Sequence, residues 1–70
     1  MMAYIFGKPD PSKEKWFVIM KDGTIKVFDT LLRYSYWHDE ASEEEKNNIY
    51  RVYTTLNEKD RQELKKLNLI

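Results

Sequence analysis

The sequence predicts a small α+β domain, in which a short antiparallel sheet of two or three strands is followed by one or two C-terminal helices. Asp22-Gly23 lies between two apolar-rich runs, which is the strongest short-range signal for a β-hairpin. Ser42, followed three residues later by Glu45, has the pattern of a capping box at a helix start. Apolar residues recur at helical spacing beyond it. Because the chain has 70 residues, we expect one domain over 1–70.

The predicted hairpin determines which side chains share a face of the sheet. A two-residue turn at Asp22-Gly23 pairs Lys21 with Thr24 and, further along, Met20 with Ile25. One face then carries only apolar side chains, and we predict that it is the core: Trp16, Val18, Met20, Ile25 and Val27. The other face mixes apolar and polar groups: Phe17, Ile19, Lys21, Thr24, Lys26 and Phe28. The run "AYIFG" at 3–7 is typical of a further short strand.

Two segments after the hairpin have helical patterns. Residues 29–38 predict a short helix with Asp29 as its N-cap, and an irregular strand is the alternative. In the second segment, we expect the Ser42 side chain to accept a hydrogen bond from the backbone N–H of Glu45. The carboxylates at 43–45 then lie in the first turn, where the helix dipole stabilises each by about 0.3–1 kcal/mol. These acidic residues therefore need no catalytic explanation.

The region 43–67 contains an apolar stripe with the spacing of a buried helix face: Ile49, Val52, Tyr53 and Leu56. Asn57, with Asp60 three residues later, predicts the N-cap of a second helix whose apolar side holds Leu64 and Leu67. A single helix over 43–67 is the alternative, since the two leucines nearly extend the first stripe. We favour a break, because Thr54, Thr55 and Asn57 together are poor residues for a helix interior.

The composition argues against several kinds of functional site. The chain has no cysteine, which excludes disulfides and thiolate metal sites, and its one histidine is too few for a His-rich metal site. The two glycines, Gly7 and Gly23, do not form a phosphate-binding loop. His38 is a candidate general base beside Asp39 and Glu40, but neighbours in sequence rarely converge on one reacting atom. We therefore expect a non-enzymatic chain that uses no metal and no cofactor.

Charge and hydropathy narrow the choice of partner. The formal net charge is zero, and residues 37–49 carry five acidic groups against one lysine. This acidic middle opposes binding to a phosphate backbone. No apolar run approaches the roughly 18 residues that span a bilayer, and no signal-peptide pattern opens the chain. We expect a soluble, cytoplasmic protein that does not bind membranes.

Aromatic and basic side chains outside the predicted core are the most informative feature for function. Tyr, Trp, Phe and Arg are enriched in the centres of protein interfaces, and the candidates here are Phe17, Ile19, Phe28, Arg33, Tyr34, Tyr36 and Trp37. If residues 30–38 or the last helix cover Phe17, Ile19 and Phe28, these three are core residues instead. A nucleic-acid site is the alternative, with rings for base stacking and cations for phosphates: Lys21, Lys26, Arg33, Tyr34, Tyr36 and Trp37.

These patterns favour a small protein-binding module, with nucleic-acid binding as the alternative. A chain of this length with no catalytic motif acts by occupying a surface on a larger protein or by pairing with a second copy of itself. Small regulators and inhibitors of enzymes have this character, including those carried by phages and other mobile elements. The two hypotheses differ in salt dependence, because contacts to phosphates weaken steeply as salt rises whereas apolar contacts do not.

Overall fold

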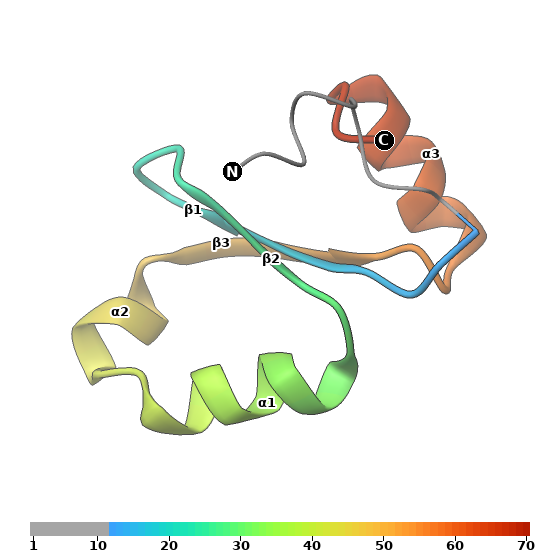
Figure 1. Cartoon of the computed structure of the whole chain (residues 1–70). Helices are drawn as coiled ribbons and strands as arrows, with labels where there is room; N and C mark the ends of the chain where they lie inside the picture. The colour runs from blue at the N-terminus through green and yellow to red at the C-terminus, as the bar shows by residue number, and fades with distance from the viewer. Residues whose placement is uncertain (1–11) are drawn as a thin grey trace, which may run out of the picture.

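The computed structural model describes residues 12–70, and its centre is an antiparallel sheet with helices on both sides. In chain order the elements of this region are β1 (Trp16–Met20), β2 (Ile25–Phe28), α1 (Leu31–Glu40), α2 (Glu43–Asn47), β3 (Ile49–Thr54) and α3 (Glu58–Lys66). The strand order is β2-β1-β3. Figure 1 shows α1 and α2 on one side of the sheet and α3 on the other. The α+β class is confirmed, whereas the predicted strand at 3–7 lies outside the described residues.

The β1–β2 hairpin is confirmed, but its turn is one residue longer than predicted. The Met20 N–H donates to the Thr24 carbonyl at 2.8 Å, and the Gly23 N–H donates to the Met20 carbonyl at 3.0 Å. This leaves a three-residue loop, 21–23, built on a tight turn followed by a left-handed residue. Gly23 takes that position with φ +93°, a conformation that costs glycine nothing and other residues a steric penalty.

The longer loop shifts the register of the hairpin by one residue. Phe17 lies opposite Val27, and Ile19 lies opposite Ile25, in place of the predicted pairs. Because side chains alternate along a strand, a shift of one residue moves every β2 side chain to the other face. Ile25 and Val27 are therefore 41% and 46% exposed, and the prediction that they belong to the core is wrong.

Residues 49–54 form strand β3, so the helix predicted from the apolar stripe is wrong. The segment IYRVYT is rich in β-branched and aromatic residues, which favour a strand. Its pairing with β1 shifts register between Ile19 and Met20, which leaves Tyr50 without a partner residue. This irregularity places Ile49 and Val52 opposite Met20 and Val18, on the same face of the sheet. A spacing of three residues on one face therefore arises from a bulge and imitates that of a helix.

The predicted helix starts are largely confirmed. The Ser42 hydroxyl accepts from the Glu45 N–H at 3.1 Å and begins α2, which ends after five residues. The Asn57 side chain accepts from the N–H groups of residues 59 and 60 and begins α3, so the break within 43–67 is confirmed. At α1 the N-cap is Thr30 and not Asp29. Asp29 instead accepts a hydrogen bond from the Lys15 ammonium at 2.6 Å.

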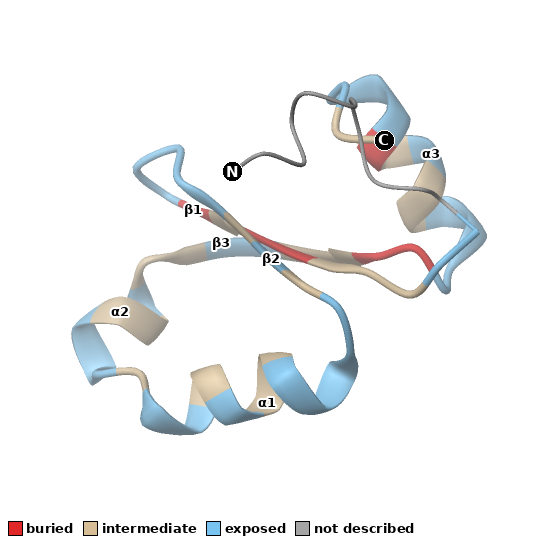
Figure 2. Cartoon of the chain, viewed as in Figure 1, coloured by how far each residue is buried: buried red, intermediate tan, exposed pale blue. Residues whose placement is uncertain are grey.

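The core of the described region is small and lies around β1. The buried apolar side chains are Phe17, Val18, Met20 and Leu64, and Figure 2 shows the buried positions along β1, at the end of β3 and in α3. Leu64 is the inward residue of α3, whereas Leu67 is 48% exposed, contrary to the prediction that both form the apolar side. Thr55 is also buried, and its hydroxyl donates to the Lys13 carbonyl and accepts from the Lys15 N–H.

Candidate protein-interaction surface

A group of contacting aromatic rings fills the space between the sheet and α1. We call it the ring cluster, and its members are Trp16, Phe28, Tyr34, Trp37 and His38. Trp16 and Tyr34 stack with an interplanar angle of 10° and 6.1 Å between centroids, and Phe28 lies 5.6 Å from Trp37. His38 lies 5.9 Å from Tyr34. All five side chains are half-buried, and α1 itself contains no buried residue.

One carboxylate ties the ring cluster to the start of α1. Glu14 Oε2 accepts from the Trp16 indole N–H at 2.7 Å and from the Leu31 backbone N–H at 2.9 Å. The N–H groups of a first helical turn have no partner within the helix, so this bond satisfies one of them. The start of α1 and the ring of Trp16 are therefore fixed to the same oxygen atom.

Lys26 links the ring cluster to α2. Its ammonium lies 5.7 Å from the centre of the Trp37 ring, a cation–π distance, and 3.9 Å from Glu45 Oε2. This lysine belongs to the nucleic-acid alternative, and its charge is already engaged by a ring and a carboxylate. Lys21, from the same alternative, lies in the exposed hairpin turn.

The opposite side of α1 is exposed and partly apolar. Leu32 and Tyr36 are 60% and 63% exposed, and their spacing of four residues places them on one side of the helix. Arg33 lies between them in sequence and is also exposed. We call these three side chains the outward face of α1. Arg33 and Tyr36 are among the interface candidates predicted from the sequence, whereas Leu32 is not, although its i, i+4 spacing from Tyr36 was a usable signal.

The other predicted interface residues are divided between two faces of the sheet. Phe17 is only 2% exposed and is a core residue, so it is not available to a partner. Ile19 is half-buried and lies beside the exposed Ile25, on the face away from α1. Phe28, Tyr34 and Trp37 are brought together in the ring cluster. The structure therefore does not gather the predicted residues into one patch.

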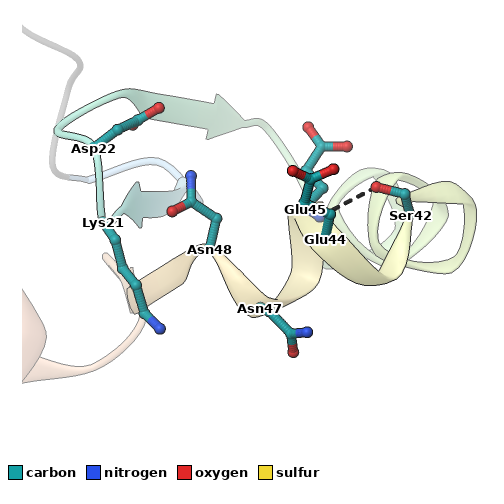
Figure 3. Close-up of a pocket in the computed structure, with 7 residues that line it drawn as sticks. All are labelled: Lys21, Asp22, Ser42, Glu44, Glu45, Asn47 and Asn48. Carbon is teal, nitrogen blue, oxygen red and sulfur yellow. Dashed lines mark hydrogen bonds between the residues drawn. The ribbon is translucent and has the colours of Figure 1, made fainter.

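A polar pocket lies between the hairpin turn and α2, where the Lys21 N–H donates to the Asn48 carbonyl at 2.7 Å. Figure 3 shows its lining residues: Lys21, Asp22, Ser42, Glu44, Glu45, Asn47 and Asn48. The Ser42 hydroxyl is the N-cap of α2, and Glu44 and Glu45 occupy the first turn of that helix. The hydroxyl and carboxylates of this pocket therefore have structural roles that account for their positions.

Lowered carboxyl pKa values in this structure arise from local hydrogen bonds. The hydrogen bond from Lys15, together with its charge, lowers the pKa of Asp29. The pKa of Asp22 is lowered by hydrogen bonds from Thr24, whose N–H donates to Asp22 Oδ1 at 2.9 Å within the turn. The pKa of Glu58 is lowered first by the hydrogen bond from Arg61. All three are accounted for by a turn or an ion pair.

Comparison with known proteins gave no match: no protein-family model, no curated protein and no solved structure is significantly similar to this chain. Within residues 12–70, no helix is long and apolar enough to cross a bilayer. The same part of the chain contains no group of three or more His, Cys, Asp or Glu side chains placed to hold a metal ion.

Proposed function

We propose that this chain is a non-enzymatic protein-binding module that contacts a larger protein through the outward face of α1, Leu32, Arg33 and Tyr36. The observation that carries the proposal is that α1 bears apolar groups on both sides. The inner side is occupied by the ring cluster, and Leu32 and Tyr36 on the outer side are exposed. Contiguous exposed apolar patches on a small domain commonly mark contact sites.

The chemistry of the outward face supports a protein partner. Tyr and Arg are enriched where interface binding energy concentrates, because each offers a large contact area together with directed hydrogen bonds. The chain would regulate or inhibit the activity of such a partner by occupying part of the partner's surface. The absence of cysteine from the chain is compatible with a reducing cytoplasm as the place of action.

Nucleic-acid binding is less well supported by the same region. Tyr34 and Trp37 contact each other and Phe28 in tilted or edge-on arrangements at centroid distances near 6 Å, so these rings already pack against one another. Lys26 is engaged by Trp37 and Glu45. Base stacking and phosphate contacts would need these side chains to be free.

Affinity capture from a lysate of the source cell tests the proposal, with the wild-type chain and two double variants as baits. The test variant is Leu32→Ala/Tyr36→Ala. The matched control is Leu56→Ala/Tyr50→Ala, because Leu56 and Tyr50 are 62% and 65% exposed and lie outside α1. All four side chains are on the surface, so we expect each double variant to keep the stability of the wild type within about 1 kcal/mol.

With the wild-type and control baits, we expect to recover one protein in stoichiometric amount, and its binding should persist after nuclease treatment and at high salt. With the test variant, the recovered amount of this protein should fall at least roughly tenfold. Equal loss with both double variants would mean that the loss is not specific to the outward face of α1, and full binding by the test variant would place the contact elsewhere on the chain. Recovery of nucleic acid, or loss of every partner after nuclease treatment, would favour the nucleic-acid alternative instead.

A further inference from the structure

We propose that two copies of this chain pair through the edge of β2 that no other strand of residues 12–70 occupies, with the two strands antiparallel about a two-fold axis at Val27. The exposed residues Ile25 and Val27 and the edge position of β2 motivate this inference. It concerns a different surface from the outward face of α1, so it does not depend on the proposed function.

The backbone of β2 alternates between groups that bind β1 and groups that point away from the sheet. The Met20 N–H points towards β2, because it donates to the Thr24 carbonyl. Backbone direction alternates along β1, so Val18 and Trp16 also point towards β2, where their partners are Lys26 and Phe28. Ile25 and Val27 therefore turn their N–H and C=O groups outward. An edge of this kind is a template for another strand.

The two edges of the sheet differ in how they are protected. On β3 the register irregularity interrupts the ladder, and the outward N–H of Thr54 donates to Asp60 Oδ2 at 3.1 Å. Bulges and covered backbone groups are common protections of edge strands. On β2 the one charged residue is Lys26, whose ammonium is drawn to Trp37 and Glu45 on the α1 side of the sheet. Within the described part of the chain, the β2 edge therefore has neither a bulge nor a side chain that covers its outward backbone groups.

Charge argues against one register of the pairing. A two-fold axis at Lys26 would place the two lysines directly opposite each other, which is destabilising for like charges on neighbouring strands. An axis at Val27 places each Lys26 opposite Phe28 of the second copy. In that register the outward backbone groups of Val27 in each copy bind each other, and the Ile25 side chains extend the same apolar face.

Cysteine cross-linking tests the register, because the chain has no cysteine of its own. With the axis at Val27, the two copies of this residue have Cα atoms about 5.5 Å apart, within the range of a disulfide. Ile25 is exposed to a similar degree, at 41% against 46%, but the Cα atoms of its two copies would lie about 14 Å apart. We expect Val27→Cys to form a covalent dimer on mild oxidation at least roughly tenfold faster than Ile25→Cys.

Sedimentation of the wild-type chain from about 10 µM to about 1 mM should show a mass that rises towards that of a dimer, since a short strand edge gives weak association. Val27→Pro removes one outward N–H without touching the ladder to β1, so this variant should remain monomeric, and Val27→Ala, which keeps that N–H, should still dimerise. A wild type that stays monomeric, or equal cross-linking rates for the two cysteine variants, would overturn the proposal. Leu32→Ala/Tyr36→Ala should dimerise normally, which separates this test from that of the proposed function.

Discussion

At the scale of single residues, Phe17 and Phe28 show how differently one side-chain type can be used on adjacent strands. Phe17 is in the centre of the sheet and almost wholly buried, on the side where α3 contributes Leu64. Phe28 lies at the end of β2 in the half-buried ring cluster. Both are interface candidates when judged from the sequence, because neither their neighbouring residues nor their spacing distinguishes them.

Truncation of these two rings should therefore have unequal effects. We expect Phe17→Ala to lower the free energy of unfolding by about 3–5 kcal/mol, because it opens a cavity in a small core. Phe28→Ala should cost about 1–2 kcal/mol, since less apolar area and a few ring contacts are lost. Urea denaturation followed by tryptophan fluorescence measures both. Equal losses would mean that the ring cluster belongs to the core as fully as Phe17 does.

At the scale of elements, local signals in the sequence were sufficient to predict those helices and turns whose positions depend on residues close together in the chain. The hairpin and the helix starts at Ser42 and Asn57 follow from turn and capping chemistry, which acts over three or four residues. The two failures have different causes, one within the turn itself and one between distant strands. The length of the loop at Gly23 fixed the register, and a bulge opposite β1 gave β3 the spacing of a helix.

The candidate site was harder to predict than the elements for the same reason. The register of the hairpin determines which residues lie on each face of the sheet, and the predicted register differs from the observed one by one residue. The ring cluster forms because α1 returns over the β2 side of the sheet and brings Tyr34 and Trp37 onto Phe28. Sequence spacing carries no information on that contact between separate elements.

The cap of α2 can be tested on its own. Ser42→Ala should lower the free energy of unfolding by about 1 kcal/mol, because the Glu45 N–H loses its acceptor. Ser42→Asp keeps an acceptor at this position and should recover most of the loss. Thermal unfolding of the three proteins gives the comparison. If Ser42→Ala melts with the wild type, the hydrogen bond makes no net contribution to stability.

At the scale of the whole molecule, the described region combines a firm centre with a loosely attached helix. Strand β1 pairs on both sides and carries most of the buried apolar side chains. Helix α1 contains none, and it is held by half-buried rings, by the Glu14 carboxylate and by its connection to β2. Segments with few buried contacts open at lower free energy than the core.

Native-state amide hydrogen exchange should show this difference directly. We expect the amides of α1 to exchange through local opening at least roughly tenfold faster than those of Phe17 and Val18 in β1. NMR-detected exchange in D₂O resolves the two groups. Protection of α1 at the level of β1 would indicate that the helix unfolds only with the whole domain.

The three-residue loop at 21–23 has a consequence for the mutations that this chain can accept during evolution. Surface loops usually accept insertions and deletions, because chain length there has little effect on the packed elements. Here, loss of one loop residue would exchange the two faces of β2. Ile25 and Val27 would then contact the rings of α1, and Lys26 and Phe28 would lie on the face of the sheet away from α1. Substitutions around Gly23 alter one side chain each, whereas a single codon lost or gained there would replace an entire surface of the protein.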